Sequence, residues 1–268
     1  MLRKNPRRVF DFDQALVRAP GRSVVNGIRF DPKIQPTFEG VAREHQAYVA
    51  ALRDAGLAVE VLPALEAWPD SVFVEDPALV FPEGAILLRP GARSRLGESD
   101  EMRDALARHF DCVLELGGDE HADGGDVLVT QEIVFIGVSR RTSRKGAEAL
   151  REKLHAFGRQ ARIVEPPSSC LHFKTAAGLL SEDTIVATAP MADSGIFAGL
   201  RILSVPEGEE AAANLLRVND FVFVGECYPR TIELLAKEGF AIVPLPVDEI
   251  AKLDAGLSCM SLRWRKRA

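Results

Sequence analysis

The sequence predicts an α/β fold built from a repeated module in which a helix is followed by a strand. Residues 52–63 and 235–246 show this module most clearly, since each begins in a helical stretch and ends in a β-rich run before a proline. In both copies a glycine, Gly56 or Gly239, stands at the break, where the left-handed conformation that ends many helices carries no steric penalty. Looser copies occupy residues 107–117 and 155–166. Repeats of this length favour a closed or stacked assembly of modules.

The expected elements follow from the apolar periodicity along the chain. Helices are predicted at residues 37–55, 98–110, 142–157 and 229–238, with a short fifth helix at 191–200. Strands are predicted in apolar, β-branched runs at residues 15–18, 71–81, 85–89, 126–130, 133–138, 184–189, 221–224 and 260–264. Strand, strand, helix and strand thus alternate roughly five times. The alternative is an ordinary α/β domain with accidental similarity, because helix–glycine–strand junctions are common.

Composition limits the classes of function. The chain has 268 residues, 47% of them hydrophobic and 27% charged, and a formal net charge of -6. This charge argues against nucleic acid as a partner, because phosphate binding needs clustered Lys and Arg. The basic start lacks the apolar stretch of a secretory signal, and no apolar run approaches the length of a membrane span. The four cysteines show no CxxC pair, so we expect a reducing, cytoplasmic setting.

One cysteine and one histidine lie in contexts that suggest catalysis. Cys259 stands in Gly-Leu-Ser-Cys-Met-Ser, where a glycine-containing loop leads to the start of a strand and would allow a substrate to approach closely. A thiolate at this place could act as a nucleophile, whereas a lone cysteine is more often a buried apolar residue. His172 stands in Cys-Leu-His-Phe-Lys and is a candidate for proton transfer.

Two acidic segments complete the candidate site. Asp-Gly-Gly-Asp-Val at residues 123–127 would form a turn or a weak calcium loop if taken alone, and the strand predicted after it would place Asp123 at a strand edge facing a pocket. Upstream, Glu75 and Asp76 lie in the predicted apolar strand, and Asp70 precedes it. Buried carboxylates cost several kcal/mol unless a cation pairs with them. We expect a bound guanidinium to be that cation, with Asp76 as its bidentate partner and Glu75 and Asp70 at the same end.

Together these motifs resemble those of the dimethylarginine dimethylaminohydrolases, a family of the guanidino-modifying pentein superfamily. The collinear set is Val-Phe-Val-Glu-Asp, Arg-Pro-Gly-Ala-x-Ser-Arg, Asp-Gly-Gly-Asp-Val-Leu, Ser-x-Arg-Thr-x-x-x-Gly-Ala-Glu, Leu-His and the C-terminal Ser-Cys. The resemblance implies a propeller of five α/β modules with the active site in a central channel. We accordingly expect one catalytic domain over residues 1–268, with a core at about 15–265. One departure is Asp254-Ala255-Gly256, where the family often has Gly directly after Asp.

The resemblance also implies a role for each residue. Cys259 would be the nucleophile, His172 the general acid and base, and Asp123, often Glu in the family, would orient His172. Arg95 and Arg141 would hold the carboxylate of an amino-acid substrate, since arginine forks suit that group. Backbone carbonyls of Ile28 and Leu253 would bind the substrate. Asp126 would be structural and bonded to backbone amides.

The expected activity is hydrolysis of Nω-methylated arginines to citrulline and a methylamine through a covalent S-alkylthiouronium on the cysteine. It requires no cofactor and no metal, and the only partner implied is a small cationic amino acid, with the chain a monomer or homodimer. Two alternatives are an arginine deiminase or citrulline hydrolase with the same chemistry, and a non-catalytic pentein that acts as a binding protein. A calcium or zinc module lacks its ligand spacing in this sequence.

Overall fold

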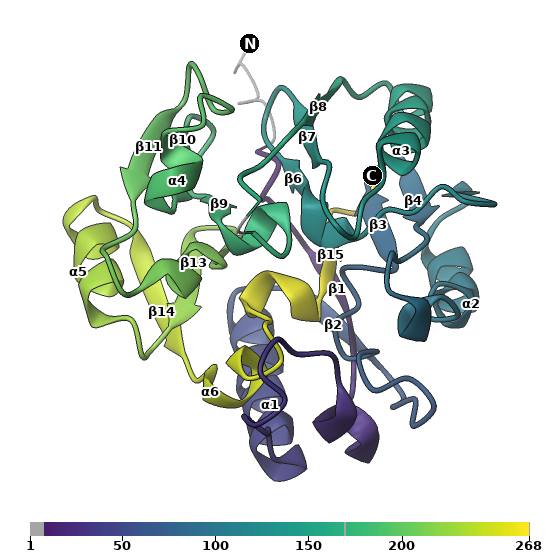
Figure 1. Ribbon diagram of the computed structural model, residues 1–268, viewed down its shortest axis with the longest axis horizontal. Coiled ribbons are helices and arrows are strands. Elements are labelled where there is room, and N and C mark those ends of the chain that lie inside the picture. The colour runs from purple at the N-terminus through teal and green to yellow at the C-terminus, as the bar shows by residue number, and fades with distance from the viewer. Residues whose placement is uncertain (1–7, 169, 268) are drawn as a thin grey trace.

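The computed structural model describes residues 8–168 and 170–267, and these residues form five three-stranded sheets arranged around a common centre (Figure 1). In each sheet the middle strand pairs antiparallel with one neighbour and parallel with the other. The ends of the expected domain, residues 1–7 and 268, lie outside the described residues. The sheets have the strand orders β15-β1-β2, β3-β4-β5, β6-β7-β8, β9-β10-β11 and β12-β13-β14.

The two ends of the chain meet in the first sheet. Strand β15 (Leu262–Trp264) pairs antiparallel with β1 (Gln14–Arg18), and β2 (Ala58–Leu62) pairs parallel with β1 on its other side. The remaining strands are β3 (Ala78–Phe81), β4 (Gly84–Leu87), β5 (Val113–Glu115), β6 (Val127–Val129), β7 (Val134–Gly137), β8 (Ala161–Val164), β9 (Ala177–Leu179), β10 (Thr184–Ala187), β11 (Arg201–Ser204), β12 (Leu216–Val218), β13 (Phe221–Gly225) and β14 (Ala241–Leu245).

A helix joins the two parallel strands of each module. The five connecting helices are α1 (Phe38–Asp54), α2 (Asp100–His109), α3 (Arg144–Ala156), α4 (Ala189–Ala192) and α5 (Pro229–Lys237), and a further short helix, α6 (Asp248–Ala251), precedes Cys259. Local sequence fixes several of their ends. The Thr37 and Ser143 side chains cap α1 and α3. Gly56 and Gly239 adopt positive φ of 93° and 86° after α1 and α5, which confirms the predicted helix–glycine–strand junctions.

Five apolar clusters lie between successive modules and close the ring. Leu16 of β1 and Leu262 of β15 share a cluster with Ala85 of β4, and the next cluster joins the β3–β4 and β6–β7 hairpins. The two clusters after these join the third module to the fourth and the fourth to the fifth. The last joins β12 and β13 to β1 and α1, so that the fifth module packs against the first. Loops from all modules therefore converge on one centre, as the proposed ring requires.

Two expected elements are wrong. Residues 71–77 form turns, and β3 begins only at Ala78. The Arg95 guanidinium explains this, because its Nη2 donates to the backbone carbonyls of Asp70 and Phe73 at 3.3 and 3.0 Å, and a strand would need such groups for its own pairing. The fifth helix, expected at 191–200, is the single turn α4, and Gly195 and Gly199 follow it with φ of 73° and 95°.

Across the described part of the chain, no helix combines the length and the apolar character that are needed to cross a membrane.

Candidate active site

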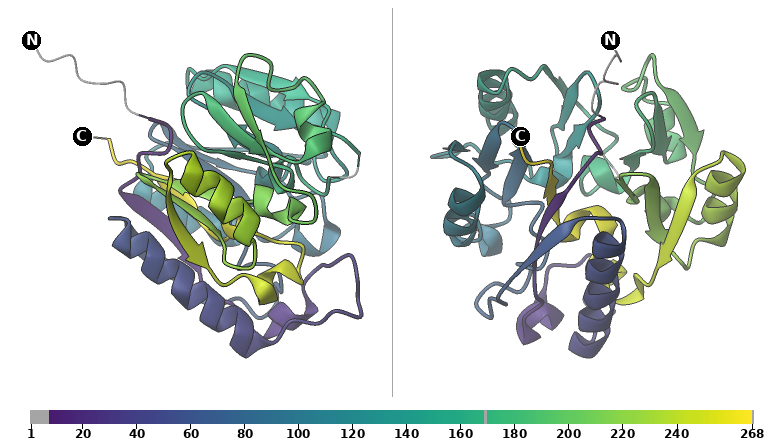
Figure 2. Two further views of the ribbon diagram at one scale, coloured as in Figure 1. Left: turned by 90° about the vertical axis from the view of Figure 1, so that its left-hand side faces the viewer. Right: turned by 180° about the vertical axis from the view of Figure 1, so that it is seen from behind.

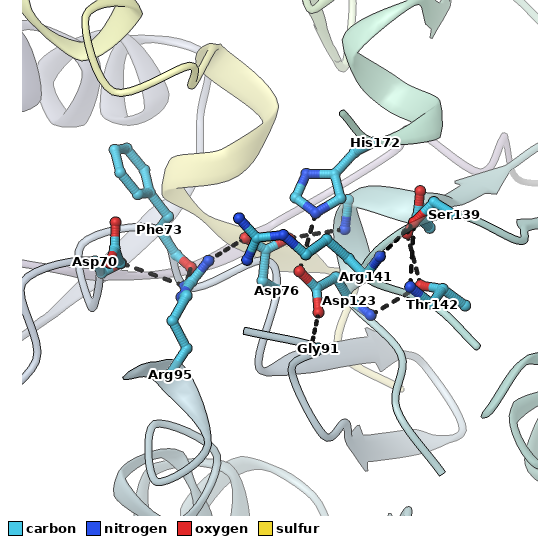
Figure 3. A network of polar contacts seen from close by, with 12 residues as sticks. Asp70, Phe73, Asp76, Gly91, Arg95, Asp123, Ser139, Arg141, Thr142 and His172 are labelled. Atoms are coloured by element: carbon cyan, nitrogen blue, oxygen red, sulfur yellow. Dashed lines mark hydrogen bonds and ion pairs between the residues drawn. The ribbon is translucent and has the colours of Figure 1, made fainter. Parts of the chain in front are cut away.

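The site is built around a buried pair of His172 and Asp123 (Figure 3). Their Nε2 and Oδ2 atoms are 2.9 Å apart. The second oxygen of Asp123 accepts a hydrogen bond of 2.7 Å from the Gly91 amide, which fixes the orientation of the carboxylate. Asp126, as expected, has a structural role, because its Oδ1 accepts from the Phe173 amide at 2.9 Å and so ties the loop of Asp123 to that of His172. The His172–Asp123 contact thus joins residues that are 49 positions apart in the sequence.

The Gly-Gly pair after Asp123 is required by close approach rather than by a left-handed turn. A Cβ on Gly124 would lie 1.9 Å from the carbonyl oxygen of Glu75. One on Gly125 would lie 2.7 Å from His172 Nδ1 and 2.9 Å from Asp76 Oδ1. The two glycines therefore let the Glu75–Asp76 segment and the imidazole pack against the loop that carries Asp123.

Asp76 lies buried beside this pair and is held as an anion. Its Oδ1 accepts from the Gly125 amide at 3.0 Å, and its Oδ2 pairs with Nη1 of Arg95. Burial opposes its ionisation, but the charges of His172 and Arg95 outweigh burial and lower the pKa of Asp76 to about 2.

Arg95 lies behind Asp76 and is fully engaged by the protein. Its Nη2 is 2.6 Å from Glu98 Oε2, and its Nε also donates to both oxygens of Glu98. Burial raises the pKa of Glu98 to about 7, even though Arg95 acts in the opposite direction. The expected role of Arg95 in holding a substrate carboxylate stays a prediction, and in the structure its guanidinium is already paired with Asp76 and Glu98.

The acids around His172 favour its protonated form. Burial alone would lower the pKa of the imidazole, but the charge of Asp76 and the hydrogen bond to Asp123 outweigh it, with a further contribution from Asp126. The pKa of His172 is raised to about 9. At neutral pH the site therefore contains an imidazolium that can give up a proton.

Cys259 lies next to this cluster on the short 3₁₀ turn Leu257–Met260 and is buried. Its carbonyl accepts from the Glu75 amide at 3.2 Å, which joins the Cys259 turn to the Glu75–Asp76 segment. Burial raises the pKa of the thiol to about 11, and the negative charges of Glu75 and Asp76 act in the same direction. Without a cationic ligand the thiol is thus protonated at neutral pH.

The Glu75 carboxylate lies at the inner end of the site. Its Oε1 is 2.6 Å from Lys174 Nζ and 3.4 Å from Arg263 Nη2, and its Oε2 accepts from Ser258 Oγ at 3.0 Å. Glu75 is therefore paired within the protein and adjoins the Cys259 turn through Ser258. Its expected contact with a substrate stays a prediction.

Asp70, Ile28 and Leu253 come together at one side of the site. Asp70 Oδ1 accepts from the Ile28 amide at 2.9 Å. A Cβ on Gly27 would lie 3.0 Å from both that oxygen and a methyl group of Leu253. The chain thus brings residues 27–28, 70 and 253 to one place, where the carbonyls of Ile28 and Leu253 were expected to bind a substrate.

Arg141 differs from Arg95 because its guanidinium has no ion pair or hydrogen bond within residues 8–168 and 170–267. Figure 3 shows its side chain extending over the Asp76–Asp123 cluster. Its positive charge also favours the ionised forms of Asp70 and Asp254, against the effect of burial. Of the two expected arginines, Arg141 is thus the one that is available to an incoming anion.

The comparisons with known proteins agree with this geometry. The family model for N,N dimethylarginine dimethylhydrolase, eukaryotic, matches residues 28–191. The chain is 35% identical over 257 residues to the N(G),N(G)-dimethylarginine dimethylaminohydrolase of Streptomyces coelicolor, with 94% of this chain and 97% of that protein covered. The chain belongs to the dimethylarginine dimethylaminohydrolase family.

Solved structures place the fold in the same family. The dimethylarginine dimethylaminohydrolase of Pseudomonas aeruginosa, as a cysteine-to-serine mutant complexed with citrulline, matches with a TM-score of 0.92 and 33% identity, covering 95% of this chain and 100% of that one. The N-terminal domain of the arginine dihydrolase ArgZ from Cyanobacteria has a TM-score of 0.84 at 19% identity, covers 94% and 98% of the two chains, and is alike in fold alone. The predicted pentein propeller is confirmed, and the protein is a hydrolase of C–N bonds in linear amidines.

In this amidine hydrolase, Asp76, Asp123 and His172 also offer a possible cation site, since one ligand atom from each lies within 4.8 Å of the others. A metal ion would have to displace the proton of His172 and compete with Arg95 for Asp76. The protonation and pairing of these residues suit proton transfer and the binding of an organic cation better than metal ligation.

Sequence reasoning missed two members of the site. Asn214 Nδ2 donates to Cys259 Sγ at 3.6 Å, while its Oδ1 accepts from the Ser258 amide at 3.3 Å. Its segment, Ala-Ala-Asn-Leu, carries no chemical motif that could have revealed it. Glu98 could have been found, because an acid three residues after an arginine in a turn often pairs with it.

Proposed function

We propose that the protein hydrolyses Nω-methylated arginines, asymmetric dimethylarginine and monomethylarginine, to citrulline and di- or monomethylamine. The observation that carries this proposal is a cysteine whose thiol is neutral in the free site, buried beside an ionised carboxylate and an imidazolium. A guanidinium bound against Asp76 supplies the positive charge that the thiolate needs, so that the nucleophile forms only when a cationic substrate is present. The citrulline complex of the Pseudomonas relative supports the product assignment.

In the first half-reaction Cys259 attacks the substrate and His172 donates a proton. Binding of the guanidinium lowers the pKa of Cys259, and the thiol proton leaves to solvent. The thiolate adds to the central guanidinium carbon, and the imidazolium of His172 donates its proton to the methylated nitrogen, which departs as a neutral amine. An S-alkylthiouronium remains on Cys259, with the ionised Asp76 opposite its positive charge.

The second half-reaction restores the enzyme. His172, now neutral, takes a proton from a water that adds to the thiouronium carbon. The C–S bond then breaks, and the proton of the added hydroxyl passes to the departing sulfur, which leaves neutral citrulline and the Cys259 thiol. The imidazolium is thereby regenerated, and the released amine takes up a solvent proton in place of the one the thiol lost. Asp123 holds the imidazole through both steps and stabilises its charged form.

In this proposal, the amino-acid end of the substrate is bound by Arg141 and by the three segments that meet at Ile28, Asp70 and Leu253. The unpaired Arg141 guanidinium suits the α-carboxylate, and backbone carbonyls suit the α-ammonium. Arg95 supports the site by holding Asp76. The cytoplasmic setting and the monomeric or dimeric state stay predictions from the sequence.

Citrulline release across a panel of guanidino amino acids tests the substrate. We expect turnover of the two methylated arginines, and release from arginine at least about tenfold slower. Roughly equal rates on arginine would replace the proposal with an arginine deiminase, and release from none would favour a binding protein.

The nucleophile is tested with Cys259→Ser, which should lower turnover by at least about a thousandfold because a serine hydroxyl is not activated here. Substrate binding, measured by calorimetry, should persist in this variant. Activity near that of the wild type would show that another residue attacks the substrate.

A further inference from the structure

A cavity lies behind the active site, at the other end of the central channel. Its volume is about 540 Å³, and its walls include strands of several modules together with residues 8–12 and the end of the chain. Figure 2 shows in its left view that both ends of the described chain lie on this side, opposite the loop that follows Ile28. The Lys174–Glu75 ion pair, at 2.6 Å, and Ser258 form its inner wall toward the catalytic cluster.

The charge of this cavity is opposite to that of the whole protein. The chain has a formal net charge of -6, yet basic side chains outnumber acidic ones among the residues that line the cavity. The acids there already have partners. Asp11 is 2.7 Å from Arg8, and Glu83 is 2.8 Å from Arg159. Glu75 is paired with Lys174, as described above.

Arg217 is the cation in this wall that most needs a partner. It is half-buried, and its Nε donates only to the backbone carbonyl of Asn219, at 2.8 Å. Within the described chain it has no acidic partner, and its guanidinium lies over the ring of Phe10 at 4.9 Å. Burial lowers its pKa, and the nearby charge of Arg8 does the same, while the more weakly acting charges of Asp220, Glu182 and Asp11 raise it without reversing the shift. Arg265, exposed on the same rim, also has no ion pair among the described residues.

The rest of the lining is mostly apolar and includes Phe10, Leu79, Leu128, Leu216, Leu262 and Trp264. A concave apolar surface with a few fixed charges is the usual form of a small-molecule site, and this volume is within the range of such sites.

We propose that this rear cavity binds an amphipathic organic anion, whose carboxylate or sulfonate pairs with Arg217 and whose apolar body lies against the aromatic and aliphatic wall. A planar guanidinium that is partly desolvated binds such a head group well, because the charge-assisted hydrogen bonds replace lost hydration. An apolar body is required because the wall offers it no polar partners over most of its surface. This site does not depend on the proposed function, since the groups that take part in the reaction lie outside its lining.

Isothermal titration calorimetry with octanoate tests the proposal, with uncharged octanamide as the matched ligand. We expect saturable binding of one octanoate per chain, and binding of octanamide at least about tenfold weaker because it lacks the charge. The same titration on Cys259→Ser should give an unchanged affinity, since octanoate does not occupy the active site. Absence of saturable octanoate binding to the wild type would overturn the proposal, as would equal affinity for octanamide.

Variants locate the site. Arg217→Gln should weaken octanoate binding by at least about tenfold, whereas Arg217→Lys, which keeps the charge, should lose less. The matched control is Arg53→Gln on α1, an exposed arginine outside the lining, which should bind as the wild type does. Circular dichroism and the thermal midpoint confirm that each variant is folded. If Arg217→Gln and the wild type bind octanoate equally, Arg217 does not hold the anion and the proposal is wrong.

Discussion

Buried charged side chains are paired differently at the active-site end of the channel and at its rear end. At the active site, Asp76, Glu98 and His172 each have a partner of opposite charge, and Arg95 joins the two acids. At the rear, half-buried Arg217 forms no ion pair within the described chain. Charges held in fixed pairs can be directed at a reaction without reorganisation, whereas a cation without a partner marks a place where a ligand can supply one.

The largest effect should come from removing the charge that orients His172. Asp123→Asn keeps the shape of the side chain but loses the negative charge, so the imidazole is less firmly protonated and held. We expect turnover to fall by about a hundredfold to ten-thousandfold. Citrulline release at saturating substrate measures this loss. A fall of less than about threefold would mean that Asp123 is structural only.

The same variant makes a prediction about pH. The pKa of His172 is raised to about 9, so in the wild type the general acid is present below that pH and turnover should fall as pH rises through 9. With the Asp123 charge removed, the alkaline limb should move to lower pH. A limb that stays in place would assign it to a different group.

A second large effect should come from Arg95→Met. Removing Arg95 leaves the buried Glu98 carboxylate without its cation and Asp76 with His172 alone, which should cost about 3–5 kcal/mol of unfolding free energy. The folded-state pKa of Glu98, about 7 with Arg95 in place, would rise further, and that of Asp76 would rise from about 2. Both rises favour protonation in the folded state, so the deficit relative to the wild type should shrink between pH 7 and pH 5. Urea titrations at both pH values test this, and a deficit independent of pH would contradict it.

An intermediate effect is expected from Asn214→Ala, which removes the hydrogen bond from Nδ2 to Cys259 Sγ. That bond favours the thiolate, so its loss should raise the pKa of the thiol further. Alkylation of Cys259 by iodoacetamide at pH 8 should slow by about tenfold, since one hydrogen bond to a charged group is worth on the order of 1.5 kcal/mol.

Because Cys112 and Cys227 are exposed and also react, the rate should be followed on the peptide that contains residue 259. Asn214→Asp is the sharper variant, because a carboxylate beside the sulfur should slow alkylation more than alanine does. If both variants react at the wild-type rate, Asn214 only supports the backbone of Ser258.

Site residues could be predicted from the sequence where a short local motif carries their chemistry. Asp123 stands in a motif whose glycines are needed for the close approach of His172 and of the Glu75–Asp76 segment, so the local pattern and the site geometry coincide there. Asn214 was missed because only the folded chain brings it near its partner Cys259, whereas the pairing of Glu98 with Arg95 is local and could have been predicted.

The fold was predictable to a similar extent. Helices that end at Gly56 and Gly239 were found because that junction is local. The pairing of β15 with β1 closes the ring across nearly the whole chain, and nothing in the local pattern encodes it. The apolar run at 71–77 was mistaken for a strand because the carbonyls it would use are taken by a side chain from another segment, Arg95.

The smallest effect on stability should come from a substitution in the rear cavity, Arg217→Met, which can be compared directly with Arg95→Met. Arg217→Met removes a half-buried cation that forms no ion pair within the described chain, so the desolvation cost that is removed offsets the lost contact with the Phe10 ring. The unfolding free energy should change by no more than about 0.5 kcal/mol, against about 3–5 kcal/mol for Arg95→Met under the same conditions. Urea unfolding of both variants gives the two values. A loss above about 2 kcal/mol for Arg217→Met would mean that its charge is paired in the folded protein and that the two ends of the channel are built alike.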